Sequence, residues 1–227
     1  MYGIYLLAPL LSSLFFLAAF LGLLVVTNLL FTKYNLPVDR SRKFLHITGG
    51  LLSLTIPFFI QSHWWVLVIC TLAFAVLLGT YFTHQLDAVH KTNRTSVGSI
   101  IFPIPVYICF AVAAFYGNTL LFFIPISILT VADPAAEWGG KRWGKYTATY
   151  FNQQKTLAGT LCFAATAIFI CLFFAFALSL PADQKLLIIF CVPLIASIAE
   201  LVSLKGWDNL TVPLLSLVAL LLIVTYL

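Results

Sequence analysis

Long apolar runs separated by short polar intervals dominate the chain. Most of these runs approach or exceed the roughly 20 apolar residues that a helix needs to cross a bilayer, and none shows the short alternating segments of a membrane β-barrel. The pattern predicts about eight membrane-spanning helices, within a range of seven to nine. The predicted spans are 2–31, 44–60, 64–82, 100–116, 119–132, 157–180, 186–204 and 210–227.

Composition supports the same fold class. Hydrophobic residues occupy 62% of the 227 positions and only 8% are charged, more apolar surface than a soluble domain carries. We therefore expect an all-α, polytopic integral membrane helix bundle that forms a single domain over residues 1–227. The first run lacks the basic start and the cleavage site of a removable signal peptide, so it is expected to remain as a span.

The cations are distributed unevenly among the predicted loops. Alternating the runs across a bilayer puts Lys185 on one side and the other eleven of the twelve cations opposite it: Lys33, Arg40, Arg42, Lys43, Lys91, Arg94, Lys141, Arg142, Lys145, Lys155 and Lys205. The positive-inside rule predicts that the cation-rich loops are cytoplasmic and that both termini lie on the opposite side. Cations scattered among loops do not indicate a nucleic-acid partner. The short termini fit a bacterial inner membrane.

The longest polar interval runs from Asp133 to Thr160 and contains the densest candidate chemistry. Asp133 follows an apolar run so short that the helix either continues past it or ends below the membrane surface. Its carboxylate suits Mg²⁺, which brings nucleotide phosphates with it. Glycines that permit close backbone approach and cations that neutralise phosphate follow: Gly139, Gly140, Lys141, Arg142, Gly144, Lys145 and Lys155. The alternative interpretation is a topology signal with a flexible turn.

Polar residues also occur within or beside other spans. His46 shares a helical face with Arg42 and Lys43, Glu200 lies inside an apolar run, and the pair Asp208-Asn209 directly precedes the last span. A charge in a span costs about 2.5–3.5 kcal/mol on insertion scales, so such residues are functional candidates. The alternatives are a core histidine, a structural partner for a cation and a helix N-cap, respectively.

Four segments in series resemble the CTP-dependent lipid alcohol kinases. These are Arg42-Lys43-x-x-His46, Asp133-x-x-Ala136-x-x-Gly139 leading to Gly144-Lys145, Lys155-Thr156-x-x-Gly159-Thr160, and Glu200 followed by Asp208-Asn209-Leu210-Thr211-Val212-Pro213. The family includes phytol, dolichol and yeast-type diacylglycerol kinases and is related to the phosphatidate cytidylyltransferases. The last segment and the small size are most similar to phytol kinase and its prokaryotic relatives. Many members have Gly-Asp where this chain has Ala132-Asp133.

The resemblance implies transfer of the terminal phosphoryl group of CTP, or another nucleoside triphosphate, to a membrane isoprenoid alcohol such as phytol, geranylgeraniol, a polyprenol or dolichol. The active site would lie at the cytoplasmic face, with Mg²⁺ as cofactor on Asp133, joined by Asp208 or Glu200. The general base is open among Asp208, Glu200 and His46. The implied nucleotide and phosphate contacts are Arg42, Lys43, Gly139, Gly140, Lys141, Arg142, Gly144, Lys145, Lys155, Thr156, Gly159 and Asn209.

Three other functions are considered. A cytidylyltransferase would join CMP to a lipid phosphate with the same cofactor, and a diacylglycerol kinase would differ only in its alcohol. An ion-coupled transporter would use Asp133, His46 and Glu200 as a relay, but such proteins usually contain internal repeats and a site at mid-membrane. The alcohol, the nucleotide and the oligomeric state are left open.

Overall fold

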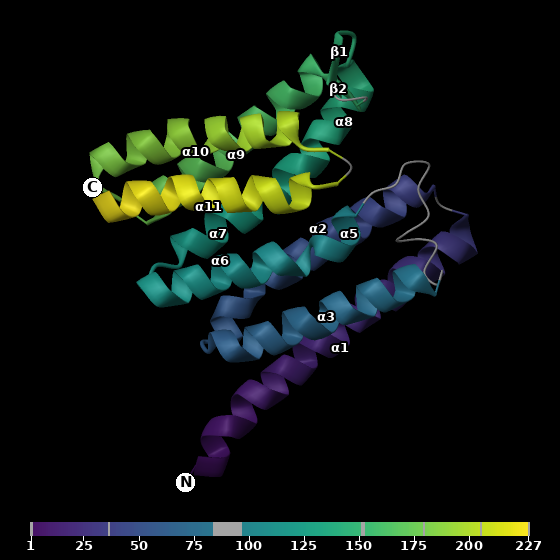
Figure 1. Ribbon diagram of the computed structural model, residues 1–227, viewed down its shortest axis with the longest axis vertical. Coiled ribbons are helices and arrows are strands. Elements are labelled where there is room, and N and C mark those ends of the chain that lie inside the picture. Colours follow the sequence, from purple (N-terminus) through teal and green to yellow (C-terminus); the bar gives the residue numbers. More distant parts are fainter. Residues whose placement is uncertain are drawn as a thin grey trace.

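The computed structural model describes residues 2–35, 37–83, 97–150, 153–178, 180–204 and 206–226. Figure 1 shows the described helices side by side in one elongated bundle, with a small hairpin projecting at one end. The helices are α1 (Tyr2–Tyr34), α2 (Val38–Phe59), α3 (His63–Phe82), α5 (Gly98–Ile101), α6 (Pro103–Tyr116), α7 (Leu120–Ser127), the π-helix η1 (Ile128–Ala132), α8 (Asp133–Trp143), α9 (Leu157–Ala177), α10 (Ala182–Val202) and α11 (Asp208–Tyr226).

The predicted all-α membrane bundle is confirmed. Seven helical segments in the described part of the chain are long and apolar enough to cross a membrane, which lies within the predicted range of seven to nine. The helix α2 is not among the seven, and its first two turns carry Asp39, Arg40, Arg42 and Lys43. The protein is therefore an integral membrane protein, and α2 joins a charged first part to an apolar run.

A continuous buried helix, formed by α7 and η1, lies at the centre of the bundle. Leu121, Ile124 and Ile128 are fully buried, and the helix contacts α2, α6, α9 and α11. Because it is apolar on all sides, it is stable only when other helices surround it. The helix continues past Ala132 into α8. Of the two predicted alternatives, the structure therefore shows the helix that continues past Asp133. Asp133 therefore lies where the central helix passes from apolar to polar sequence.

Close packing joins α2 to the π turn. A Cβ atom added at Gly50 would lie 2.2 Å from the Thr130 Oγ1 atom, so only glycine lets the two backbones approach this closely. One turn earlier on α2, the His46 Nε2 atom lies 2.9 Å from the carbonyl oxygen of Leu129. These contacts hold the polar part of α2 beside Asp133. The π turn was not predicted from the sequence.

A short antiparallel hairpin follows α8 where the sequence predicts only a polar loop. Its strands β1 (Thr147–Tyr150) and β2 (Gln153–Thr156) pair Thr147 with Thr156 and Ala148 with Lys155. The end of β2 leads directly into α9, where the Thr156 hydroxyl accepts a hydrogen bond from the Gly159 N–H at 3.1 Å. This arrangement fixes Lys155 at the start of a membrane helix.

The charged segments gather at the end of the bundle that carries the hairpin (Figure 1). Lys33 lies in the last turn of α1, and Lys141 and Arg142 lie in the last turn of α8. Lys185 lies near the beginning of α10, at the end where the C-terminus also lies. Lys91, Arg94 and Lys205 lie outside the described residues. The direction of the bundle across a membrane stays a prediction.

The contact between α2 and the π turn leads to a stability prediction. Gly50→Ala forces Thr130 and its helix to shift, which is expected to destabilise the protein by about 1–3 kcal/mol. The midpoint of thermal unfolding of the protein purified in detergent measures this. Gly49→Ala is the matched control, because a Cβ atom at Gly49 meets no atom within 4 Å. An equal loss of stability in both variants would contradict the proposed contact.

Candidate functional site

A large cavity at the charged end of the bundle contains most of the predicted site residues. Its volume is about 1140 Å³, and α1, α2, α3, α5, α6, α8, the hairpin, α9, α10 and the start of α11 all contribute to its lining. Twelve predicted residues line it: Arg42, Lys43, His46, Asp133, Gly140, Lys141, Lys155, Thr156, Gly159, Glu200, Asp208 and Asn209. Gly139, Arg142, Gly144 and Lys145 are not among the lining residues.

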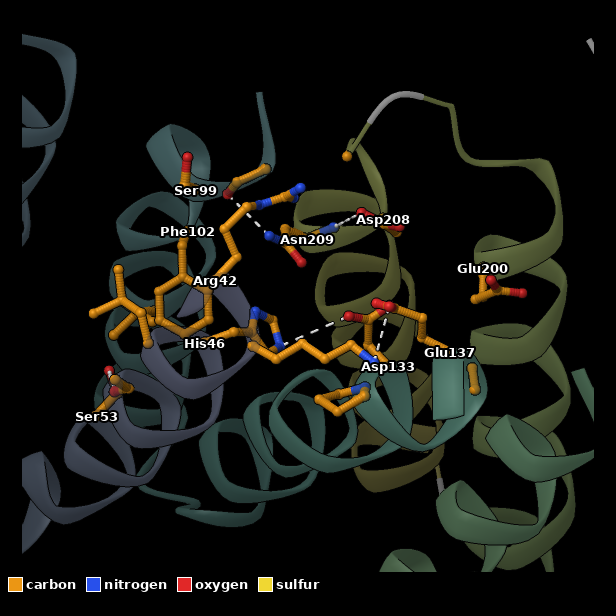
Figure 2. Close-up of a pocket in the computed structure, with 18 of the residues that line it drawn as sticks. Arg42, His46, Ser53, Ser99, Phe102, Asp133, Glu137, Glu200, Asp208 and Asn209 are labelled. Atoms are coloured by element: carbon orange, nitrogen blue, oxygen red, sulfur yellow. Dashed lines mark hydrogen bonds and ion pairs between the residues drawn. The ribbon is translucent and has the colours of Figure 1, made fainter. Parts of the chain in front are cut away.

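Five carboxylates line the cavity, and three of them, on three separate helices, were predicted as site residues. Figure 2 shows Asp133 at the start of α8, Asp208 at the start of α11 and Glu200 on α10 around the same space. The Asp133 Oδ2 atom lies 3.9 Å from His46 Nε2, the nitrogen that also contacts the Leu129 carbonyl. Because a carbonyl oxygen only accepts, Nε2 carries the hydrogen in that bond. In the neutral ring the lone pair is then on Nδ1.

Lys155 and Glu200 form a buried ion pair in the wall of the cavity. The Lys155 ammonium group contacts the Glu200 Oε1 atom and donates a second hydrogen bond to the Glu200 backbone carbonyl at 3.0 Å. Only 18% of the Lys155 side chain and 7% of the Glu200 side chain are exposed. The Glu200 Oε2 atom is buried and has no hydrogen-bond partner among the described residues. Glu200 thus fixes the position of Lys155 while retaining one unused oxygen.

A second charged cluster lies nearer the surface. The Glu137 Oε1 atom lies 3.0 Å from Lys43 Nζ and 2.5 Å from Lys141 Nζ, and Lys141 Nζ also lies 3.4 Å from Asp39 Oδ2. Two cations predicted to bind phosphate are therefore paired with carboxylates. Asp39 was missed in the sequence, although it lies on the same face of α2 as Lys43 and His46.

The glycines of the long polar interval mainly permit helix packing. Added Cβ atoms would lie 2.2 Å from Cys162 Sγ at Gly139, 2.7 Å from Thr156 Oγ1 at Gly140 and 2.9 Å from the Ala136 carbonyl oxygen at Gly159. These contacts bring α8 against the beginning of α9. Gly140 and Gly159 also line the cavity, so a phosphate contact at these two positions stays a prediction.

Asn209 links two elements at the mouth of the cavity. Its side-chain amide donates to the Gly98 carbonyl at 2.9 Å, which ties the start of α11 to the start of α5 (Figure 2). Its backbone N–H donates to the Asp208 Oδ1 atom at 2.9 Å. Asp208 is the first residue of α11, and its role as an N-cap stays a prediction.

Comparisons with known proteins give one match. No protein family model matches the chain, and neither does any solved structure. A phytol kinase of Synechocystis sp. is 29% identical over 206 residues, which cover 87% of this chain and 85% of that kinase. The match therefore covers most of the length of both chains.

The resemblance to the lipid alcohol kinases is confirmed. The same similarity supports a phosphotransferase that acts on an alcohol group.

The carboxylates of this cavity suit a hard cation. No group of three His, Cys, Asp or Glu side chains among the described residues is arranged as a complete metal site. Mg²⁺ is commonly bound by only one or two carboxylates together with substrate phosphates and water. Asp133 and Asp208, which face the same cavity, and the unpartnered Oε2 atom of Glu200 fit that pattern.

The buried ion pair leads to a second prediction. Lys155→Met or Glu200→Gln alone leaves one uncompensated polar partner and should destabilise the protein by about 3–5 kcal/mol, whereas the double variant should recover part of that loss. Thermal unfolding of the four proteins gives the coupling energy. Lys141→Met is the control, since its side chain is 60% exposed and surface pairs contribute at most about 1 kcal/mol. Additive losses would contradict the pairing.

Proposed function

We propose that the protein is a lipid alcohol kinase that transfers the terminal phosphoryl group of CTP to a membrane isoprenoid alcohol such as phytol or geranylgeraniol. One observation carries the proposal. A single cavity contains carboxylates and a fixed cation at its charged end and continues between apolar side chains of the membrane helices. A nucleotide suits the first part, and the hydrocarbon tail of an alcohol suits the second.

The charged residues of the cavity are assigned different roles according to the groups that surround them. Asp133 and Asp208 would hold Mg²⁺ together with the nucleotide phosphates, and the bound ion would supply neutralisation of the charge on the transferred group. Lys155 contacts the phosphates, while Glu200 positions Lys155 and is not itself a phosphate contact. Arg42 lines the opposite wall, on α2, and is suited to the lipid phosphate product.

The reaction forms one bond and breaks one. The alcohol oxygen attacks the terminal phosphorus of CTP, the bond from that phosphorus to the bridging oxygen breaks, and CDP leaves with the bonding electrons. The hydroxyl proton passes to a base in the cavity. Glu200 is the least suited of the three predicted bases because its Oε1 atom is engaged by Lys155. Asp208 and His46 remain. Asp208 could act as the base only if Asp133 held the metal without it, whereas His46 would take the proton on Nδ1, because Nε2 donates to the Leu129 carbonyl.

The proposal includes an orientation. A cytosolic nucleotide must reach the charged end of the cavity, so this end faces the cytoplasm and both termini face the other side. The excess of Lys and Arg at the same end favours the same arrangement. In a bacterium the corresponding membrane is the inner membrane.

The test uses the purified full-length protein in lipid nanodiscs with γ-labelled CTP and phytol, geranylgeraniol, farnesol, a long polyprenol or diacylglycerol. The label is expected in an isoprenoid monophosphate, and ATP in place of CTP tests the nucleotide. Asp133→Asn should lower the rate at least about a hundredfold, because the carboxylate that holds the metal-bound phosphates is lost.

Asp183→Asn is the control, since Asp183 is an exposed aspartate in the first turn of α10, at the other end of the bundle. Its rate should equal that of the wild type. Release of the label as pyrophosphate would instead identify a cytidylyltransferase. Equal lipid phosphorylation by the wild type and Asp133→Asn would exclude the assigned role of Asp133.

A further inference from the structure

We infer that the apolar part of the cavity is a closed-ended groove that holds the hydrocarbon tail and limits its length. The inference rests on the proposed kinase function and adds the site of the tail to it. We call this part the tail groove. It is lined by Phe16 and Phe20 from α1, Leu52 and Ile56 from α2, and Ile69 and Ala73 from α3.

The packing of three helices creates the tail groove. The helices α2 and α3 are neighbours in the chain and are joined by only residues 60–62, yet they scarcely contact each other, whereas α1 packs against both. Protein interiors are normally packed to crystal-like density, so a gap of this kind calls for an occupant. The cavity lies in this gap.

The chemistry of the lining selects a hydrocarbon. From His46 toward the end of the groove at Phe16, the lining residues carry no charge. The Ser53 hydroxyl donates a hydrogen bond to the Gly49 carbonyl oxygen at 2.8 Å. No polar group of this lining therefore needs a partner from a ligand. The tail groove begins directly beside His46 and Asp133, so a hydroxyl at the charged end and a chain in the tail groove can belong to one molecule.

Phe16 closes the far end. It is 2% exposed, and its ring centroid lies 5.9 Å from that of Phe59 in the last turn of α2. Phe16 and Ile56 each lie about five turns from the connection between α1 and α2, so they are at the same depth. The distance from His46 to Ile56 along α2 is about 15 Å at 1.5 Å per residue. This equals about half of the 30 Å hydrocarbon thickness of a bilayer, or one leaflet.

The total volume also fits two ligands better than one. Sites for a single drug-sized ligand usually have volumes of about 300–1000 Å³, and the cavity exceeds this range. A nucleotide at the charged end leaves space for one chain of about leaflet length. Alcohols of the length of farnesol to geranylgeraniol can place the whole tail inside, while a long polyprenol cannot.

Gly49 lies in the half of the tail groove nearer to His46, about 4.5 Å from it along α2. It is buried and lines the cavity, and a Cβ atom there would meet no atom within 4 Å, so a larger side chain would project into the empty space. Gly49→Leu should shorten the tail groove. Phe16→Ala should lengthen it, because the bulky group at the closed end is removed.

The experiment measures rates of phosphorylation of farnesol, geranylgeraniol and a long polyprenol by the full-length protein in nanodiscs. Gly49→Leu should lower the ratio of the geranylgeraniol rate to the farnesol rate by about tenfold or more, and Phe16→Ala should raise the ratio of polyprenol to geranylgeraniol by a similar factor. Gly79→Leu and Phe15→Ala are the controls. Gly79 has open space around it outside the cavity, and Phe15 is 64% exposed on the outer face of α1.

The outcomes separate the two proposals. Phosphorylated lipid with the same chain-length profile in all five proteins would overturn the tail groove and leave the kinase function intact. Absence of phosphorylated lipid from the wild type with every alcohol would overturn the proposed function itself. If Phe16→Ala does not fold, the altered ratio of Gly49→Leu still decides, since a Cβ atom at Gly49 meets no atom within 4 Å.

Discussion

The whole structure depends on one continuous helix whose first part is apolar and whose second part is polar. The α7–η1 segment is apolar on every side and is stable only when four other helices surround it, but it runs straight into Asp133 and the polar helix α8. A buried apolar helix cannot slide out of the bundle, because the spaces that its side chains occupy would be left as empty cavities. Asp133 is thereby held at a fixed depth, at the boundary where a charged nucleotide and an apolar tail can both be accommodated.

The Lys155–Glu200 ion pair offsets the cost of a charged side chain near the membrane boundary. A lysine near the membrane boundary is costly unless an opposite charge accompanies it, and Glu200 provides that charge from inside α10. The hairpin fixes the backbone of Lys155, and the carboxylate fixes its ammonium group. In the proposed kinase, this cation would be oriented before a phosphate binds, so little side-chain entropy would be lost on binding.

The parts of the structure that depend on composition and run length were predictable. The bundle and the approximate span count follow from where apolar runs begin and end, whereas the short run before Asp133 left two alternatives open, a helix that continues and one that ends below the membrane surface. The convergence of His46, Asp133, Glu200 and Asp208 was predictable only as a shared depth, because each residue is costly in a membrane and the positive-inside pattern puts them at one end.

Features that depend on packing between distant segments were not predictable. The hairpin strands are four residues each and mostly polar, so no alternation stood out. Gly139 looked like a phosphate contact but faces Cys162 of the next helix. The residues of the tail groove, such as Leu52 and Ile56, are indistinguishable in sequence from residues that fill a core. Only the separation of α2 from α3 reveals that they face a cavity.

The π turn before Asp133 has a consequence for how the chain tolerates changes in length. Successive side chains of a regular α-helix are rotated by about 100°, and a π turn takes up one additional residue within its circuit. The angular phase of α8 relative to α7 is therefore offset by that residue. An insertion or deletion between Ile128 and Ala132 would leave α7 seated in the bundle yet rotate the carboxylate of Asp133 away from its present direction. At this point the chain converts a change in length into a change in angle.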